Sequence, residues 1–248
     1  MPISREDLLR IERVAVRAWP ALETAPLAGW LWRYSGGGSQ RANSVSPLAY
    51  SGADLEASIG EAERRYQARG AAAMFQICDI AAPPELDQRL ADRGYRLQEP
   101  CSCLAKELTA TAAMPGEVEI AERASPDWLQ VYCAGITPSR RQAAPSILAR
   151  VPAPRAFLLL RRATTPISVA LAVASDEVVI AECVATASAY RRQGASEHIM
   201  RALEAWGARL GARIAALQAV TANAPAQALY AKLAYHRVGG YHYRVRDQ

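Results

Sequence analysis

One order of elements restricts the fold of this chain more than any other feature: a strand that leads through a glycine turn directly into a helix. Residues 178–186 are apolar and rich in β-branched side chains, as in a buried strand. The turn that follows reads Arg191-Arg192-Gln193-Gly194-Ala195-Ser196. A helix capped by Gly211 is expected over residues 196–210, because apolar residues recur there every three or four positions: Ile199, Leu203, Trp206 and Leu210.

This arrangement predicts a site for an anion. The first backbone amides of a helix lack partners and point at one spot in front of it. Gly194 would let a phosphate approach the backbone closely, and Arg191 and Arg192 add positive charge. An ordinary strand-to-helix connection with two solvated arginines explains the same residues, so the turn alone leaves both interpretations open.

Segments with strand and helix patterns surround this turn and form the second half of the chain. Strands are predicted over residues 118–121, 156–160, 167–173, 178–186 and 214–220. Helices are predicted from Ser125, over residues 140–150, and over residues 226–233, where Asn223 and Pro225 begin the last one. Residues 235–245 predict a pair of aromatic strands broken at Gly239-Gly240. The predicted order is βααβββαβαββ.

The first half of the chain repeats part of this pattern. Helices are predicted over residues 6–19 and 55–69, and extended segments over residues 30–34 and 43–47. A strand, a helix and a strand between residues 73 and 95 then parallel residues 215–235. The first copy has Leu90 where the second has Tyr230 and lacks a glycine turn, so we interpret it as degenerate.

Small and helix-breaking residues between positions 109 and 116 predict the boundary between the two halves. The expected domains are residues 1–110 and residues 117–248. Hydrophobic residues make up 51% of the chain and charged residues 21%, which is enough apolar material for packed cores.

Charge and cysteine content narrow the class of ligand and the compartment. The net charge of +5 comes from scattered arginines, which favours a small anionic ligand over nucleic acid. No long apolar run or signal-peptide pattern is present, so we expect a cytoplasmic protein without a membrane segment. The five cysteines are irregularly spaced, which predicts reduced thiols and no metal site.

The sequence around the glycine turn resembles a known family. Tyr190 to Ser196 is similar to motif A, [QR]-x-x-G-x-[GA], of the GNAT N-acetyltransferase superfamily. The segment from Leu217 to Tyr235 resembles that family's L-x-V-x-x-x-N-x-x-A-x-x-L-Y-x-K-x-G-F pattern. The resemblance covers residues 118–245, and the first half resembles only the degenerate amino-terminal halves of tandem members. It implies the α/β (α+β) GNAT fold: a mixed, mostly antiparallel central sheet flanked by helices, with a second, smaller GNAT-like amino-terminal domain.

The resemblance also implies acetyl-CoA as the co-substrate and assigns residues to it. The pantetheine arm would hydrogen bond the backbone of the strand that precedes the turn, and the pyrophosphate would take the amides of the turn and the first helical residues. Asn223 would contact the arm, cap its own helix, or do both. The implied cofactor-binding residues are Val184, Ala185, Thr186, Arg191, Arg192, Gln193, Gly194, Ala195, Ser196, Glu197, Asn223 and Ala226.

Two further residues are implied in the chemistry. The hydroxyl of Tyr230 would protonate the thiolate of CoA as a general acid, although a core tyrosine would fit the same position. Members that use a glutamate on the strand after motif A would place it at Gln218, and an amide cannot take a proton. Glu182 is a replacement that could deprotonate an ammonium through a water molecule, or a salt-bridged strand residue.

The remaining polar features have weaker functional interpretations. Structural roles are expected for the three histidines, which lack triad-like partners. The segment Tyr241-His242-Tyr243-Arg244 would border the acceptor site or form an aromatic sheet face. The segment Arg41-Ala42-Asn43-Ser44 is expected to be a surface turn, with a reach into the acceptor cleft as the alternative.

The expected function is transfer of an acetyl group from acetyl-CoA to a primary amine by direct attack. The alternative is a non-catalytic acyl-CoA-binding or regulatory protein of the same fold. A dinucleotide-binding oxidoreductase is excluded because the turn lacks G-x-G-x-x-G. The acceptor is a small molecule or a peptide: a peptide amino terminus, an amino sugar, a polyamine or an antibiotic. A monomer or a homodimer is expected.

Overall fold

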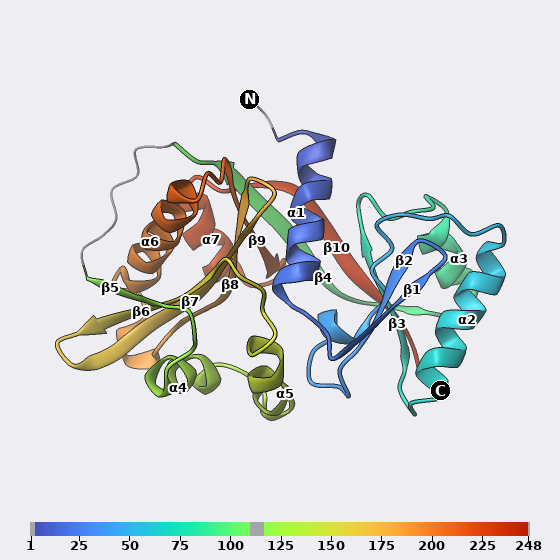
Figure 1. Ribbon diagram of the computed structural model, residues 1–248, viewed down its shortest axis with the longest axis horizontal. Coiled ribbons are helices and arrows are strands. Elements are labelled where there is room, and N and C mark those ends of the chain that lie inside the picture. The colour runs from blue at the N-terminus through green and yellow to red at the C-terminus, as the bar shows by residue number, and fades with distance from the viewer. Residues whose placement is uncertain (1–2, 110–116, 248) are drawn as a thin grey trace.

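One sheet runs through both halves of the molecule (Figure 1). The computed structural model describes residues 3–109 and 117–247, and within them eight strands form this sheet. In spatial order they are β3 (Ala73–Cys78), β10 (His236–Arg246), β4 (Arg96–Glu107), β9 (Ile214–Val220), β8 (Val178–Thr186), β7 (Thr165–Ser175), β6 (Arg155–Arg162) and β5 (Val118–Ala121). The pair β8–β9 is parallel, whereas the other neighbours are antiparallel.

Helices cover both faces of this sheet over β6, β7 and β8. One face carries α6 (Ala195–Arg209), and the other carries α1 (Arg5–Ala18) and α4 (Pro126–Ala134). Two further helices of this half are α5 (Pro138–Leu148) and α7 (Ala224–Lys232). The mixed, mostly antiparallel sheet with flanking helices confirms the predicted α/β fold.

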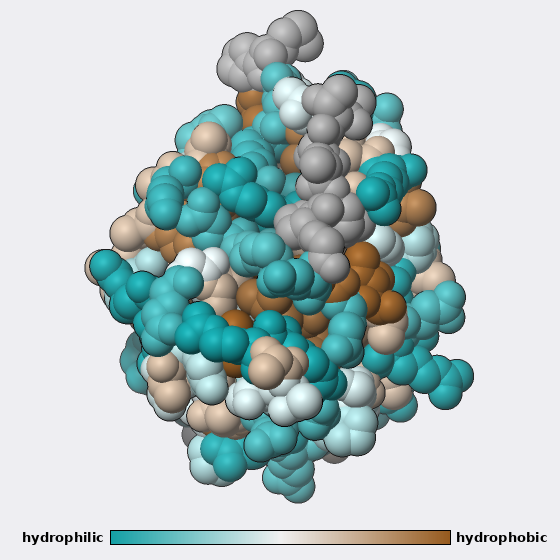
Figure 2. Space-filling view, turned by 90° about the vertical axis from the view of Figure 1, so that its left-hand side faces the viewer, coloured by the Kyte–Doolittle hydropathy of each residue, from teal (hydrophilic) through white to brown (hydrophobic). Residues whose placement is uncertain are grey.

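Alternation along residues 156–160 of β6 and 169–174 of β7 produces the two cores. Leu159 and Leu171 face α1 and α4, whereas Leu158 and Ala170 face α6. Successive strand residues point to opposite faces, so an almost continuous apolar run is what a strand covered on both sides requires. The surface viewed in Figure 2 is mainly hydrophilic, with a smaller apolar area near its centre.

The rest of the first half forms a lobe around a third core. A separate two-stranded sheet of β1 (Glu23–Leu27) and β2 (Trp30–Tyr34) packs with α2 (Leu55–Gln67) and β3, and α3 (Leu86–Asp92) follows. Trp30, Trp32 and Phe75 are buried there. The sequence prediction missed β1, which contains Pro26, a residue that strands tolerate only at edges.

The two copies of the internal repeat exchange their last strands. The copies are β3-α3-β4 and β9-α7-β10, but β4 pairs with β9 and β10 pairs with β3. The last strand of each copy is therefore hydrogen bonded to the first strand of the other copy. The division into residues 1–110 and 117–248 stays a prediction, because residues 110–116 lie outside the described residues.

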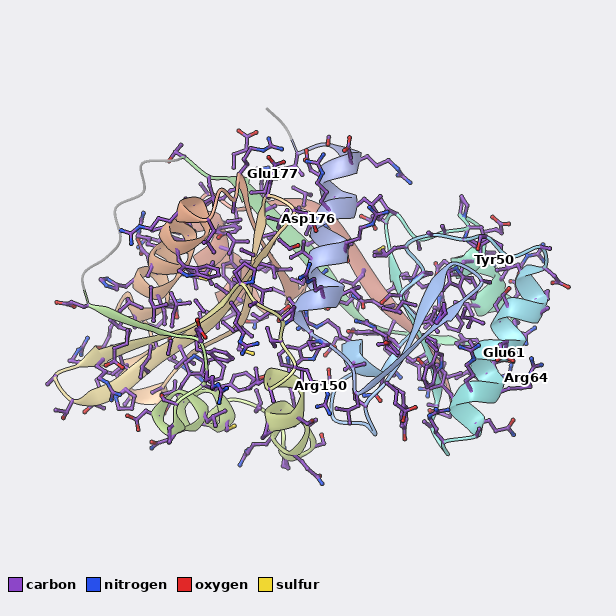
Figure 3. The ribbon with its side chains drawn as sticks, viewed as in Figure 1. Tyr50, Glu61, Arg64, Arg150, Asp176 and Glu177 are labelled. Carbon is purple, nitrogen blue, oxygen red and sulfur yellow. The ribbon has the colours of Figure 1, made fainter. Side chains whose placement is uncertain are left out.

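The helix α1, from the first half, belongs to the core beneath β7 and β8 of the second half. Its Arg10 also contacts Glu177, whose carboxylate lies 3.4 Å away. Figure 3 shows Asp176 and Glu177 at the β7–β8 turn beside this helix. The two halves thus share a helix interface as well as a sheet.

Two predicted details are wrong. Residues 236–246 form one continuous strand rather than a pair, with a register shift at Gly239. The glycines allow close packing instead of a turn, because a Cβ on Gly240 would lie 2.9 Å from the carbonyl oxygen of Cys101. Leu210 is not part of the buried stripe: it is the C-cap residue of α6 and is 51% exposed.

Candidate active site

A gap between β8 and β9 opens the sheet at the centre of the second half. The two strands are paired only over Val178–Ala181 and Ile214–Leu217, and they separate beyond these residues. Cys183 has a positive φ of 55°, and the β7–β8 register shifts beside it, so β8 carries a bulge where it leaves its partner. Unpaired backbone groups of β8 are therefore available at this gap.

Two cavities of about 740 Å³ each meet at the gap. The first, which we call the α6 cavity, lies between the end of β8, the start of α6, and α7. The second, the inter-half cavity, is lined by β8, β9, the α4–α5 connection and residues of the first half. The residues common to both cavities are Gly135, Val184, Ala185, Asn223, Ala226 and Tyr230.

The start of α6 has the properties of an anion site. Its N-cap is Gly194, with φ of 83°, and no side chain caps the first amides. A Cβ on Gly194 would meet no atom within 4 Å, so the space in front of these amides is open. Unpaired amides and the positive end of the helix dipole both favour a phosphate there. The residues present therefore fit a diphosphate group.

Side-chain hydrogen bonds hold this turn in place. The hydroxyl of Ser196 lies 2.7 Å from that of Thr186, which in turn lies 2.9 Å from that of Ser168 on β7. The amide of Gln193 accepts a hydrogen bond from Arg162 at 2.7 Å. It also donates to the carbonyl of Ala189 at 3.1 Å. The strand, the turn and the helix are thus tied together before any ligand binds.

The inter-half cavity contains a buried ion pair between the two halves. Arg41, 12% exposed, donates to both carboxylate oxygens of Glu182, each at 2.6 Å. Burial alone would lower the pKa of Arg41, but the Glu182 carboxylate outweighs burial and the pKa lies above its ordinary value. The guanidinium also lies over the ring of Trp19, 5.2 Å from its centre.

The ion pair continues into the half-buried amide of Gln218 and a second carboxyl, that of Glu12. The side-chain oxygen of Gln218 accepts a long hydrogen bond of 3.5 Å from Arg41, and its NH₂ group donates to the carboxylate of Glu12 in α1 at 3.0 Å. These partners fix the orientation of the amide, because an arginine only donates. Glu12 is 2% exposed, and burial raises its pKa to about 7 against the lowering effect of the Gln218 hydrogen bond.

Tyr230 lies where the two cavities meet. It is 7% exposed and contacts the ring of Tyr235 edge to face at 6.0 Å. Burial, followed by the nearby Glu182 charge, raises the pKa of Tyr230 to about 12. The hydroxyl therefore keeps its proton at neutral pH and can act as a donor toward either cavity.

Comparison with known proteins identifies the family. A family model described as probable histone acetyltransferase Rv0428c C-terminal matches residues 6–246. The chain belongs to this family.

Relatives agree with membership of the wider GNAT superfamily. The uncharacterized N-acetyltransferase YobR of Bacillus subtilis is 27% identical over 250 residues, covering 97% of this chain and 99% of YobR. The fold is similar to a GCN5-related N-acetyltransferase from Kribbella flavida, with a TM-score of 0.72, 17% identity, and coverage of 97% and 95% of the two chains. The fold is also similar to a tandem GNAT protein from the clavulanic acid biosynthesis pathway. The TM-score is 0.65 at 10% identity, and the match covers 98% of this chain and 95% of that one. The protein is thus an acetyltransferase of the GNAT superfamily.

Most residues predicted to bind the co-substrate line the α6 cavity of this GNAT protein. They are Val184, Ala185, Thr186, Arg191, Arg192, Gly194, Ala195, Ser196, Glu197, Asn223 and Ala226. Gln193 is an exception, because it lines a shallow hollow on the other side of the turn. Asn223 does cap α7, since its side chain accepts from the amide of Ala226 at 3.2 Å.

For the residues at the inter-half cavity, the sequence left open a structural role and a role at the acceptor site. Glu182 is the salt-bridged strand residue, and it also lines the cavity. Tyr241 and Tyr243 line the cavity, whereas His242 points away from them and lies 2.8 Å from Asp87. The expectation of a surface turn at residues 41–44 was wrong, because Arg41 reaches the cavity and is buried there.

The sequence prediction missed several residues of the GNAT site. Tyr132 of α4 and Arg140 of α5 line the inter-half cavity, and Lys232 of α7 lines the α6 cavity. Two of the missed residues had a local signal. Glu12, which binds Gln218, follows Ile11 on the apolar side of a predicted helix, where a charge is unusual, and Lys232 is the lysine of the family pattern matched to residues 217–235. Contacts between distant elements place Tyr132 and Arg140, so no local pattern marks these two.

Two features are absent from the part of the chain that the structure describes. In residues 3–109 and 117–247, no group of three or more histidine, cysteine, aspartate or glutamate side chains is arranged to hold a metal ion. No helix in the same part of the chain is long and apolar enough to cross a membrane. The cysteines are free, and burial raises the pKa of Cys183 to about 12.

Proposed function

We propose that this protein transfers the acetyl group of acetyl-CoA to a primary amine by direct attack, with Tyr230 as the general acid. The observation that carries the proposal is the pair of cavities that meet at Tyr230. One cavity has the uncapped start of a helix for a diphosphate, and the other has a buried carboxylate that suits a cationic amine.

The path of acetyl-CoA follows from the unpaired groups. The diphosphate takes the amides from Arg192 to Glu197, and Arg191 and Arg192 add positive charge at the same cavity. The pantetheine arm extends along Val184, Ala185 and Thr186, where β8 has left β9 and offers backbone groups. The thioester then lies at the residues that both cavities share.

The amine nitrogen attacks the thioester carbon from the inter-half cavity. The carbon–sulfur bond of the tetrahedral intermediate breaks, and the sulfur takes the proton of the Tyr230 hydroxyl. The proton that the attached nitrogen loses returns through water to Tyr230. The pKa of Tyr230, raised by burial, keeps this proton available at neutral pH. The products are an acetamide and CoA with a free thiol.

Glu182 is proposed to accept the ammonium proton through a water molecule. A carboxylate has about four lone-pair sites, and the two bonds from Arg41 use two of them. The remaining sites can accept from an ammonium group or from water. Gln218 takes no part in this transfer, because its amide is held between Arg41 and Glu12.

Binding and turnover test the proposal in two stages. We expect acetyl-CoA to raise the melting temperature, because it binds only the folded protein. CoA-thiol release is then measured with a peptide of free amino terminus, glucosamine, spermidine and kanamycin. Absence of stabilisation by acetyl-CoA would refute the co-substrate, whereas stabilisation without thiol release from any amine would favour a non-catalytic acyl-CoA-binding protein.

A further inference from the structure

The first half supplies part of the inter-half cavity through a loop that follows β2. Residues of this loop that line the cavity are Gly37, Gly38, Ser39, Gln40, Arg41 and Asn43. The opposite wall contains Thr137, Ser139 and Arg140, from the N-cap and first turn of α5. The degenerate half thus contributes to the site although it has no glycine turn of its own.

One asparagine fixes the conformation of this loop. The side-chain oxygen of Asn43, Oδ1, accepts hydrogen bonds from the backbone amides of Ser35 at 2.7 Å and Gly37 at 3.2 Å. Its NH₂ group donates to the carbonyls of Ser39 at 2.7 Å and Gly37 at 3.1 Å. The indole of Trp19 also donates to the Ser39 hydroxyl at 2.8 Å. The loop is therefore preorganised.

The loop touches the opposite wall of the cavity. A Cβ on Gly38 would lie 2.6 Å from the carbonyl oxygen of Ser139 and 2.6 Å from the Cβ of Ala143, both in α5. Gly38 also has φ of 74°, which disfavours any side chain. The loop of the first half and α5 therefore meet at one side of the cavity.

Arg41 turns from this loop toward the reacting groups. Its two bonds of 2.6 Å to Glu182 are bidentate, the geometry that restricts a carboxylate most strongly. Trp19 and Gln218 hold the guanidinium from two other sides. Glu182 and Arg41 are 6% and 12% exposed, so water competes little for either.

We infer that the first half completes the acceptor-binding part of this site and that Arg41 is a positioning residue. Arg41 holds the Glu182 carboxylate so that its free lone pairs face an incoming ammonium group. The inference rests on the proposed function and extends it: a cationic amine is recognised between the two halves, whereas acetyl-CoA is bound by the second half alone.

The test compares Arg41→Gln, Arg41→Lys and Glu182→Gln with wild type. We expect Arg41→Gln to lower kcat/KM for the amine about 100-fold, the loss typical of a misplaced group, while the Kd for acetyl-CoA changes less than about twofold. Arg41→Lys restores part of the activity, because one charged donor remains. The control is Arg69→Gln, since Arg69 also pairs with a glutamate, Glu23 at 2.5 Å, and lies over a tryptophan, Trp32, but in an exposed pair outside the cavity lining.

A double-mutant cycle separates positioning from a structural role. If Arg41 acts through Glu182, Arg41→Gln causes little further loss of kcat/KM in a Glu182→Gln background. Equal losses in both backgrounds would overturn the inference, as would an unchanged kcat/KM in the single variant.

Amine binding, measured by calorimetry with spermidine, glucosamine, kanamycin and the peptide, distinguishes this inference from the proposed function. If wild type binds an amine but does not acetylate it, and Arg41→Gln weakens this binding, the acceptor site is supported and the transfer reaction is refuted. Transfer or binding that is indifferent to Arg41 would overturn the inference and leave the proposed function intact. Absence of both binding and transfer with wild type would overturn both.

Discussion

The hydroxyl of Tyr230 makes no hydrogen bond to another described residue, although the side chain is 7% exposed. The hydroxyl oxygen is not among the buried polar atoms that lack a partner, so it is open to the cavities, where a bound thioester would offer it one. The raised pKa of Tyr230 keeps its proton in place until a thiolate forms. An accessible hydroxyl that keeps its proton is what the proposed general acid requires.

We predict that Tyr230→Phe lowers kcat at least about 100-fold, the contribution expected of a general acid. The Kd for acetyl-CoA should stay within about twofold of wild type, because the ring still packs on Tyr235. Tyr50→Phe is the control: this hydroxyl contacts Ser58 in the first half, away from both cavities (Figure 3). An unchanged kcat in Tyr230→Phe would assign Tyr230 to the core.

Glu12 predicts a pH dependence of stability. Its pKa is raised from 4.5 to about 7 by burial, so between these values the unfolded chain has lost a proton that the folded protein retains. The free energy of unfolding therefore falls as pH rises through this window, by roughly 3 kcal/mol for a group so fully buried.

Urea unfolding of Glu12→Gln measures this effect. The variant should lack the decline and be more stable than wild type at pH 8, by up to the same amount of roughly 3 kcal/mol. Glu6→Gln is the control, because Glu6 lies on the same helix with its side chain 74% exposed. Parallel pH profiles for wild type and Glu12→Gln would contradict a buried carboxyl with a raised pKa.

At the scale of elements, the two ends of α6 give a matched pair of glycines. Gly194 and Gly211 have φ of 83° and 84°, and a Cβ at either would meet no atom within 4 Å. Alanine at each position should reduce the free energy of unfolding by a similar amount, about 1 kcal/mol. Only the start of the helix faces the proposed diphosphate.

We predict that Gly194→Ala weakens acetyl-CoA binding about tenfold or more, because a methyl group enters the space in front of the amides. Gly211→Ala should bind acetyl-CoA as wild type does. Isothermal titration of both variants checks this difference. Equal affinities would mean that the turn is an ordinary strand-to-helix connection.

Local patterns predicted most elements of the second half. The bounds of β5, β8 and β9 match the predicted segments, because apolar β-branched runs between polar breaks define a strand without reference to its neighbours. The predicted break at Gly239-Gly240 was wrong because glycine is required there by close packing: a side chain on Gly239 would meet Leu8, and one on Gly240 would meet Cys101.

The site was predictable where it is built from one continuous segment. The turn from Arg191 to Ser196 and the cap at Asn223 have local signatures, and both line the α6 cavity. The inter-half cavity depends on contacts between residues far apart, such as Arg41 and Glu182, which are 141 positions apart. No spacing rule in the sequence brings such residues together.

At the scale of the whole molecule, the exchange of β4 and β10 makes the halves depend on each other. Without the first half, β9 and β10 lose β4, which lies between them, and β7 and β8 lose the cover of α1. Pairing between strands so distant in sequence is set by topology rather than by strand pattern, so it could not be predicted.

We therefore predict that residues 1–109 and 117–248, expressed separately, do not fold, and that co-expression restores a folded complex. Exposed strand edges and an uncovered apolar face should make each fragment aggregate. Gel filtration and circular dichroism of the separate and co-expressed fragments check this. A monomeric 117–248 fragment with cooperative unfolding would show instead that the second half is an autonomous domain.

The central claim is that acetyl-CoA binds at the start of α6 and reaches along β8 to Tyr230. Amide hydrogen exchange with and without acetyl-CoA tests it most directly, because the readout requires neither a known amine nor turnover. We expect slower exchange in peptides containing Val184–Thr186 and Arg192–Glu197, and unchanged exchange in α2 of the first half. Protection centred on the first half, or no protection in these two segments, would contradict it.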